Sequence, residues 1–321
     1  MGTNKLKKFL FFFDSRATFA YSNNIIKIFK KKNCKFEILL SGNYLEKDMK
    51  INNSIFNKNK LKVKYKCKFK SPTNKIESWP ISFGNAMKEY AQALTKAKPD
   101  LVIITGDRIE TLCLSITCSY MNIPLAHIQA GDKSGHIDDV ARSVIAKLSH
   151  LHFAPSKQAC VRLKKWGEES NRIYFTGAPQ LDDMIFKKKR KKGYYVIIFH
   201  PILNEKNQIK HQVLELVNAI KSSGIKVKWI YPNNDIGFKN ILNIIKKFRS
   251  DKFEIIPNFE RKKFLDIISS CNGMIGNSSS GIIEASMFKI PVINIGNRQN
   301  GRPQSTNIVN CKPKNDEIVK N

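Results

Sequence analysis

The sequence contains few acidic residues and no long apolar run. Its 321 residues include 56 lysines and arginines against 26 aspartates and glutamates, which gives a formal net charge of +30. No stretch of about 18 apolar residues could span a bilayer. The apolar run Phe9–Phe13 is too short for a secretion signal and is cut off by Asp14. We therefore expect a cytoplasmic protein without a membrane partner, in which Phe9–Phe13 is a buried strand.

Paired cysteines are also missing. The seven cysteines form no CxxC motif and are scattered as Cys34, Cys67, Cys113, Cys118, Cys160, Cys271 and Cys311. An odd number of scattered cysteines argues against a disulfide framework and against a zinc site. We expect reduced thiols and no bound metal.

The positive charge is spread over almost every segment. The one dense block is KKKRKK, residues 187–192, and no aromatic residues interleave it. Nucleic-acid binding favours a clustered basic patch with aromatic residues for stacking, so we expect no nucleic-acid partner. A diffuse positive field would still help to collect an anionic small substrate.

Short apolar runs alternate with segments of helical periodicity. Strands are predicted at residues 8–13, 36–42, 100–106, 124–129, 151–156, 172–177, 194–200, 227–232, 253–258, 273–278 and 291–296. Helices are predicted at residues 84–98, 211–224 and 238–248. A further amphipathic helix is predicted from about residue 137, with Ile137, Val140, Val144, Leu148 and Leu151 on one face. Such alternation is typical of parallel sheets covered by helices on both faces.

The strands fall into two series, which predicts two doubly wound, Rossmann-like α/β domains. We place the first domain at residues 1–181 and the second at 182–321, with the basic stretch 182–192 as the hinge. Ligands of such sheets bind at the carboxyl ends of the strands, so we expect the site in a cleft between the domains. Residues 43–80 are polar, and their pattern predicts no element.

Two polar clusters follow predicted strands of the first domain. ITGDRIE places Asp107, Arg108 and Glu110 just past a strand end, where Asp107 could act on a ligand or simply cap the next helix. The stretch AHIQAGDKSGHIDDVARS adds Asp132 in a glycine-containing loop, and Asp138 and Arg142 four residues apart on one helix face. These residues could transfer protons around a sugar ring, or form a capping acid with an exposed ion pair.

Two strand ends of the second domain also carry polar residues. FHP places His200 at a carboxyl end, where it could act as an acid or base, contact a phosphate, or be an ordinary surface or core residue. YPNNDIG places Asn233 after another strand, where the pattern alone favours a turn with an asparagine cap.

The segment GNSSSGIIEA, residues 276–285, joins a predicted strand to a helix start through small residues. Free backbone N–H groups and the hydroxyls of Ser278, Ser279 and Ser280 would suit a diphosphate. Glu284, one turn further on, could accept hydrogen bonds from ribose hydroxyls, and Arg298 and Arg302 could reach the same anion. The simpler interpretation is a serine-capped helix.

These motifs together resemble one family. GDRIE, the AHI…IDD…R…KLSHLHF segment, GAPQLDD, FHP, PNNDIG and GNSSSGIIEA…PVINIGNRQNGR occur in the order and spacing of the hydrolysing UDP-N-acetylglucosamine 2-epimerases. The sialic-acid-pathway enzymes and the UDP-diacetylbacillosamine 2-epimerases are the most similar branches. The resemblance covers residues 98–310. It implies a GT-B-like pair of Rossmann domains and no cofactor.

The resemblance also implies a reaction and roles for residues. UDP leaves from C1 of a UDP-N-acetylhexosamine as the C2 proton is removed, and water then adds to give the free C2-epimeric sugar. Proton transfer would fall to Asp107, Asp132, Asp138 and His200, with Arg142 orienting Asp138. The UDP-linked substrate would be bound by Arg16, Arg108, Asn233, Ser278, Ser279, Ser280, Glu284 and Arg298. The family further suggests a homodimer or tetramer in sialic or nonulosonic acid biosynthesis.

Two segments differ from the family pattern. Gln129 stands where the family carries an acid, and an amide cannot exchange a proton. The amino-terminal family motif T-R-A-D-Y is Ser-Arg-Ala-Thr-Phe at residues 15–19. A non-catalytic nucleotide-sugar-binding protein, an altered GT-B enzyme and a glycosyltransferase therefore remain as alternative functions.

Overall fold

The chain forms two compact units. The computed structural model describes residues 7–45, 56–57, 59–70, 77–134, 138–182, 184, 192–232, 237–248, 250–257 and 261–321. The first unit consists of Met1–Lys133 and Asp138–Asp183, and the second of Ser134–Ile137 and Met184–Asn321. Each unit has its own parallel sheet, described separately below.

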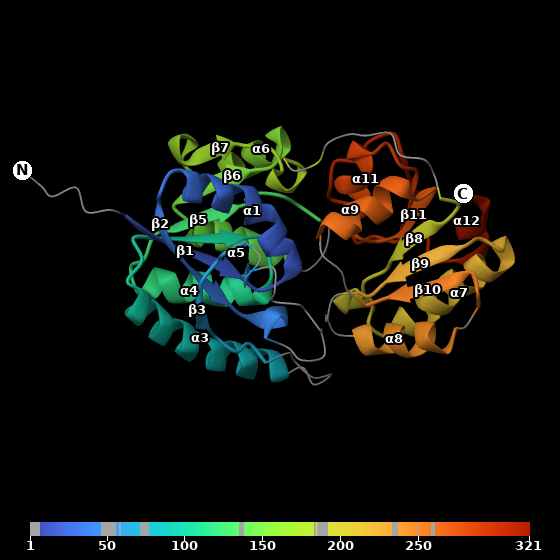
Figure 1. The fold of residues 1–321 in the computed structure, drawn as a ribbon, viewed down its shortest axis with the longest axis horizontal. Helices are drawn as coiled ribbons and strands as arrows, with labels where there is room; N and C mark the ends of the chain where they lie inside the picture. The colour runs from blue at the N-terminus through green and yellow to red at the C-terminus, as the bar shows by residue number, and fades with distance from the viewer. Residues whose placement is uncertain are drawn as a thin grey trace, which may run out of the picture. The chain divides into compact units, whose positions relative to one another are not determined.

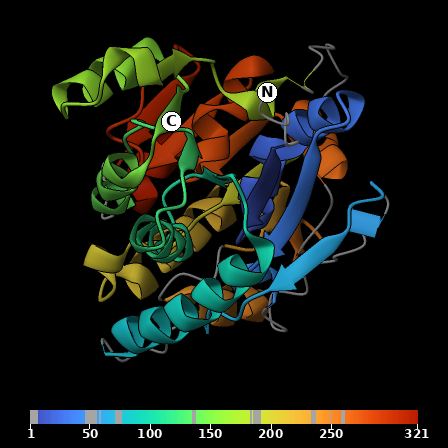
Figure 2. The same ribbon diagram turned by 90° about the vertical axis from the view of Figure 1, so that its left-hand side faces the viewer.

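The first unit is built on a seven-stranded sheet with the order β3-β2-β1-β4-β5-β6-β7. Every neighbouring pair runs parallel. Figure 2 shows β3 at the edge of this sheet, beside β2. The strands are β1 (Lys8–Phe13), β2 (Lys35–Leu40), β3 (Val63–Lys66), β4 (Leu101–Thr105), β5 (Leu125–Ile128), β6 (Leu151–Ala154) and β7 (Ile173–Phe175).

Helices cover both faces of this sheet because successive side chains of each strand point to opposite faces. Leu10 and Phe12 of β1 pack with α3 and α4, which Figure 1 shows together on one face. Phe11 and Phe13 pack with α1 on the other face. The helices are α1 (Arg16–Lys31), α3 (Ser78–Ala97), α4 (Ile109–Tyr120), α5 (Asp138–Leu148) and α6 (Lys157–Lys165), with short 3-10 turns at Gly42–Tyr44 (η1), Ser170–Arg172 (η3) and Pro179–Leu181 (η4).

The second unit has a six-stranded parallel sheet with the order β10-β9-β8-β11-β12-β13. Its strands are β8 (Tyr195–Ile198), β9 (Val227–Ile230), β10 (Phe253–Ile256), β11 (Gly273–Gly276), β12 (Val292–Ile295) and β13 (Ile308–Cys311). Its helices are α7 (Ile209–Ser223), α8 (Phe238–Lys247), α9 (Arg261–Ser270), α10 (Ser279–Ile282), α11 (Glu284–Met287) and α12 (Asn315–Lys320), with a 3-10 turn η5 at Leu203–Glu205. Figure 1 shows α7 and α8 on one face of this sheet and α9 and α11 on the other.

The predicted fold class is confirmed: each unit is an open, parallel α/β sheet with helices on both faces. The eleven predicted strands correspond to β1, β2 and β4–β12, and the predicted helices at 84–98, 211–224 and 238–248 correspond to α3, α7 and α8. Two strands, β3 and β13, were not predicted. No helix in the described part of the chain is long and apolar enough to cross a membrane.

The contact between β8 and β11 depends on one glycine. Gly276 ends β11 with φ +137°, and a Cβ atom added there would lie 2.1 Å from the carbonyl oxygen of Ile198 in β8. Real Cβ atoms do not approach an oxygen so closely, so any side chain would force the two strands apart. Glycine therefore allows β11 to pair with β8 where the serine turn begins.

We expect Gly276→Ala to lower the free energy of unfolding of the second unit by roughly 3 kcal/mol or more, through strand separation and backbone strain. Gly193→Ala is the matched control, because Gly193 also has positive φ (+69°) but no atom lies within 4 Å of the added Cβ. The control should lose only about 1–2 kcal/mol. Urea unfolding measures both, and equal losses would contradict the role of the Gly276–Ile198 contact.

Candidate active site

The first polar cluster begins where β4 ends. After Thr105 the chain turns at Gly106 (φ +81°) and reaches Asp107 and Arg108, and α4 begins at Ile109. Arg108 is the N-cap residue and makes no side-chain cap bond. Asp107 is therefore not a helix cap. Its carboxylate instead forms an ion pair with Arg142 of α5.

Arg142 connects α5 to the loop after β4. Its guanidinium pairs with Asp107 and, at 2.8 Å, with Asp139. The residue is only 2% exposed, so the alternative in which Arg142 belongs to an exposed ion pair does not hold. The side chain of Asp138 lies outside the described residues, and its predicted pairing with Arg142 stays a prediction.

The buried face of α5 also differs from the expected one. Val140 and Val144 are 66% and 39% exposed, whereas Ile145 and Ala146 are fully buried. The small side chain of Ala146 packs against α6, and Ile145 packs into the core beside α4. This rotation turns Arg142 inward, toward Asp107.

The loop after β5 is fixed to its neighbours on two sides. The Nε2 atom of His127, at the end of β5, lies 2.8 Å from the carbonyl oxygen of Gly106. Full burial lowers the pKa of His127 to about 3, so the ring is neutral and Nε2–H donates to this carbonyl. On the other side, a Cβ added to Gly131 would lie 2.6 Å from Leu163 of α6. Asp132, which follows Gly131, is 7% exposed.

Gln129 occupies the centre of this loop. Its backbone adopts φ +66°, a left-handed conformation that is rare for residues other than glycine. Its side chain is 5% exposed and donates from Nε2 to Oε1 of Gln180 in η4, at 2.9 Å. The loop therefore carries two buried polar side chains, the amide of Gln129 and the carboxylate of Asp132.

Asp14 and Glu110 form a second buried acidic pair. The sequence pointed to Glu110 as part of the polar cluster after β4 and did not single out Asp14. Asp14 follows β1 directly and is 0% exposed, and Glu110, in the first turn of α4, is 3% exposed. Arg108 donates to Glu110 from Nε and Nη2, at 3.2 and 3.1 Å. An acid directly after a buried strand was a usable signal, since the same criterion found Asp107. Arg16 begins α1, and burial lowers the pKa of its guanidinium.

In the second unit, Asn277 connects two strand ends. Its side chain accepts from the backbone N–H of His200 at 2.7 Å and donates to the carbonyl oxygen of His200 at 2.9 Å. This pair of bonds fixes His200, 6% exposed, at the carboxyl end of β8. The sequence pointed to the serines of this segment and missed Asn277, whose contribution depends on a backbone partner 77 residues away.

The serine turn follows Asn277. Ser278 is the N-cap of α10, and its side chain accepts from the N–H of Ser280. This is the serine cap of the simpler interpretation, and Ile283 (φ −93°, ψ −65°) separates the four-residue α10 from α11. Arg298 donates from Nη1 to the carbonyl oxygen of Asn277 at 3.2 Å, which brings this predicted residue to the serine turn.

Glu284 begins α11 and is 8% exposed. Its Oε1 atom lies 3.2 Å from Nη1 of Arg261, the first residue of α9. The sequence did not single out Arg261. Asn233 lies outside the described residues, so its predicted contact with the substrate stays a prediction.

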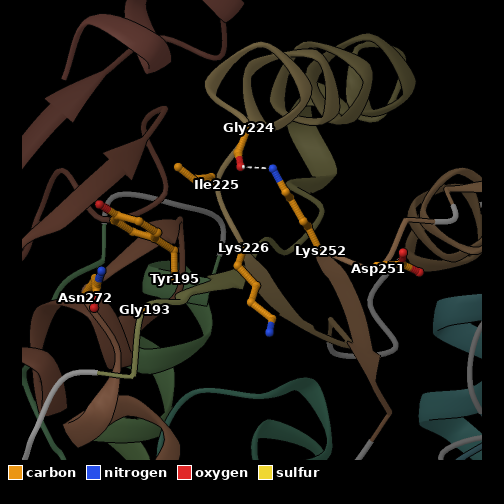
Figure 3. A pocket seen from close by; sticks show the side chains of 8 residues that line it. All are labelled: Gly193, Tyr195, Gly224, Ile225, Lys226, Asp251, Lys252 and Asn272. Carbon is orange, nitrogen blue, oxygen red and sulfur yellow. Dashed lines mark hydrogen bonds between the residues drawn. The ribbon is translucent and has the colours of Figure 1, made fainter.

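One cavity, of about 610 Å³, lies elsewhere. Figure 3 shows its lining, which includes Tyr195, Lys226, Lys252 and Asn272. These residues stand at the amino ends of β8, β9, β10 and β11, at the edge of the sheet opposite the serine turn. Lys252 donates to the carbonyl oxygen of Gly224 across this space at 3.1 Å. This cavity therefore contains none of the predicted site residues.

The described residues contain no group of three His, Cys, Asp or Glu side chains that could hold a metal ion. All seven cysteines are free thiols, four of them buried.

The burial of His127 predicts a pH dependence of stability. The folded protein keeps the ring neutral, while the unfolded chain takes up a proton near pH 6.5. This contribution to stability is therefore present above about pH 6.5 and is lost as the pH falls. Acidification from pH 6.5 to 5 should therefore lower the free energy of unfolding by roughly 2 kcal/mol through His127.

His127→Gln keeps an Nε2–H donor for Gly106 without a titrating ring. Urea unfolding of both proteins at these two pH values measures the effect. The loss on acidification should be smaller in His127→Gln, and an identical loss in both proteins would contradict this assignment.

Comparison with known proteins identifies the family. Residues 27–321 match the family model described as UDP-N-acetylglucosamine 2-epimerase. The chain is 31% identical over 252 residues to the UDP-N,N'-diacetylbacillosamine 2-epimerase (hydrolyzing) of Legionella pneumophila, and 33% identical over 251 residues to the UDP-N-acetylglucosamine 2-epimerase of Neisseria meningitidis. Each match covers 74% of this chain and 67% of the relative, so the similarity spans about two thirds of these relatives.

The fold agrees with solved structures. The UDP-GlcNAc 2-epimerase of Methanocaldococcus jannaschii, crystallised with UDP-GlcNAc and UDP, superimposes with a TM-score of 0.82 at 20% identity. The superposition covers 98% of this chain and 91% of that one. Family match, sequence identity and fold agree, and the chain belongs to the UDP-N-acetylglucosamine 2-epimerase family of enzymes.

Proposed function

We propose that the protein is a hydrolysing 2-epimerase of a UDP-N-acetylhexosamine, either UDP-GlcNAc or a 2,4-diacetamido relative. It would release UDP and the free C2-epimeric sugar for sialic or nonulosonic acid biosynthesis. The observation that carries the proposal is the ion pair between Asp107 and the buried Arg142, at the carboxyl edge of the first sheet. The names of the Legionella and Neisseria relatives support the hydrolysing reaction and the N-acetylated sugar.

The first half of the reaction requires a base and a stabilised leaving group. A carboxylate removes the proton from C2, the C1–O bond to UDP breaks, and a double bond forms between C1 and C2. Arg142 fixes one oxygen of Asp107, which leaves the carboxylate oriented for proton transfer. Asp138 and His200 are the other proposed proton-transfer groups.

The second half adds water across the double bond. Hydroxide bonds to C1, and a proton returns to C2 from the opposite face, which inverts that carbon. Asp132 is the proposed donor, because it is a buried carboxyl in the fixed loop after β5. Gln129 of the same loop has no exchangeable acid proton, so we assign it hydrogen bonding rather than proton transfer.

The diphosphate needs oriented donors as negative charge develops on the leaving oxygen. Ser278, Ser279 and Ser280 offer hydroxyl and backbone donors, and Arg298 is held at the same turn. Arg16 and Arg108 are the proposed cations of the first unit. Glu284 would accept hydrogen bonds from the ribose, and Asn233 would contact the nucleotide.

The reaction itself gives the first test. With UDP-GlcNAc in deuterated water, we expect free N-acetylmannosamine carrying deuterium at C2, followed by proton NMR. UDP-2,4-diacetamido sugars should be tested in parallel, because the relatives support both substrates. Transfer to an added acceptor sugar would instead indicate a glycosyltransferase, and binding without turnover would indicate a binding protein.

Removal of the proposed base gives the second test. Asp107→Asn should lower kcat on the order of 10²–10⁴-fold, because an amide cannot remove the C2 proton, while UDP binding is unchanged. Asp100→Asn is the matched control at the amino end of the same strand, where Asp100 accepts from the backbone of Lys8 at 2.7 Å. Full activity of Asp107→Asn in the NMR assay would refute its role.

The proposed ribose contact gives the third test. Glu284→Gln should weaken UDP binding roughly 10–100-fold, because charge-assisted hydrogen bonds become neutral ones. Calorimetric titration with UDP measures the change. Glu254→Gln is the control. Glu254 lies in β10, its side chain is exposed and pairs with Lys228, and this variant should bind UDP normally. Equal affinities of the two variants would exclude a ribose contact by Glu284.

A further inference from the structure

The chain of the first unit buries two carboxyl groups that the proposed reaction does not use. Asp14 follows β1 and is 0% exposed, and Glu110 is 3% exposed in the first turn of α4. Buried carboxyl groups are costly unless they are paired or protonated. Both lie at the carboxyl edge of β1 and β4, beside Arg108, the proposed substrate-binding cation. This position indicates that the two carboxyl groups act on Arg108.

The hydrogen bonds divide the two carboxyl groups into different roles. Glu110 accepts two bonds from Arg108, at 3.2 and 3.1 Å, in a forked geometry that fixes the guanidinium plane. Asp14 accepts from two neutral hydroxyls, Thr111 at 2.8 Å and Thr18 at 3.2 Å. The Nε atom of Arg108 is 4.0 Å from Oδ1 of Asp14. Glu110 therefore orients Arg108, and Asp14 acts on it mainly through charge.

Other ionisable groups surround this pair. Burial is the main effect that raises the pKa of Asp14 to about 6, Glu110 raises it further, and Arg108, Thr111 and Ser15 oppose the increase. Tyr44 of η1 and Tyr90 of α3 also face Asp14, and burial raises the pKa of both hydroxyls, so they stay neutral. Arg16 of α1 lies near Tyr44.

We propose that Asp14 and Glu110 are positioning residues for Arg108, and that protonation of Asp14 sets how strongly Arg108 attracts the anionic substrate. The proposal rests on the proposed function, in which Arg108 binds the nucleotide sugar. When Asp14 is neutral, one carboxylate offsets the charge of Arg108. When Asp14 ionises, a second negative charge lies 4.0 Å from Nε and weakens the attraction for a diphosphate.

The proposal predicts a KM that rises with pH. For a UDP-sugar, KM should increase about 3–10-fold between pH 5 and 7.5 as Asp14 ionises. The substrate is a suitable probe because its diphosphate is a diester without the terminal phosphate ionisation near pH 6. Asp14→Asn should keep the low KM across this range. If KM rose with pH in Asp14→Asn as much as in the wild type, the proposal would be contradicted.

Glu110→Gln separates binding from chemistry. The amide can accept only weakly from Arg108, so KM should rise about 10-fold at every pH, while kcat changes less than about threefold. A loss of kcat with unchanged KM would show that Glu110 does not position a substrate-binding group.

The position of Gly42 allows a second, indirect test. A Cβ added to Gly42 would lie 2.6 Å from Oε1 of Glu110, so Gly42→Ala should displace the carboxylate and raise KM as Glu110→Gln does. Gly167→Ala is the matched control: it imposes the same left-handed strain (φ +82° against +52°), but its nearest neighbour is Nζ of Lys147 at 3.5 Å. Equal KM values in the two variants would contradict the positioning role.

One measurement does not depend on turnover. Carbon-13 NMR of labelled aspartate carboxyls should show one signal, absent in Asp14→Asn, with a midpoint near pH 6. The midpoint should move down in Glu110→Gln and up in Arg108→Gln. If the wild type titrates in this way but turns over no UDP-sugar, the proposed function fails while the coupling stands. If turnover is as expected but Asp14 titrates below about pH 4, then Asp14 does not regulate Arg108, while the proposed function stands.

Discussion

A guanidinium with little exposure to solvent needs carboxylate partners, and this requirement organises the carboxyl edges of both sheets. Arg142 pairs with Asp107 and Asp139, Arg108 pairs with Glu110, and Arg261 pairs with Glu284. Arginine suits these positions because its planar fork can hold one carboxylate through two N–H groups and is always charged. The chain has 26 acidic residues against 56 basic ones. A gathering of acidic residues at these strand ends is therefore not a consequence of an acid-rich composition.

The lysines behave differently. Lys64 and Lys147, for example, are about half exposed while they pair with Glu37 and Glu168. Exposed pairs of this kind contribute little to stability, but the lysines supply most of the positive charge. Their diffuse field fits the long-range collection of an anionic substrate, whereas the few arginines paired with carboxylates at the strand ends fit its short-range orientation. The net charge of +30 therefore does not require a nucleic-acid partner.

The sequence predicted the fold because its strands are short continuous apolar runs, which occur only where both faces of a sheet are covered. β3 and β13 were missed for the same reason. β3 reads VKYK with every second residue exposed, and β13 has two exposed residues of four, because both lie at sheet edges. The buried face of α5 was predicted wrongly because periodicity favoured Val140 and Val144 over the small Ala146, whose fit against α6 depends on tertiary packing.

Site residues could be predicted only where polar or charged side chains directly follow a strand in the sequence. Asp107, Ser278 and His200 were singled out in this way, and the same criterion would have selected Asp14. Asn277 and Arg261 were not singled out, because each is defined by a partner far along the chain: the backbone of His200 and the carboxylate of Glu284. Sequence spacing cannot supply such pairs, since the partners meet only when parallel strands bring their ends to one edge.

Asp14 and His127 act on stability with opposite signs, and this follows from one cause. Burial disfavours the charged form of each group, so it raises the pKa of Asp14 to about 6 and lowers that of His127 to about 3. As the pH rises from 4 to 6, Asp14 destabilises the fold because the unfolded chain loses the proton first. Over the same range His127 stabilises it, because the unfolded chain is the state that binds the proton. The two contributions offset each other, so the first unit can keep a titrating carboxyl beside Arg108 with little net change in stability over this range.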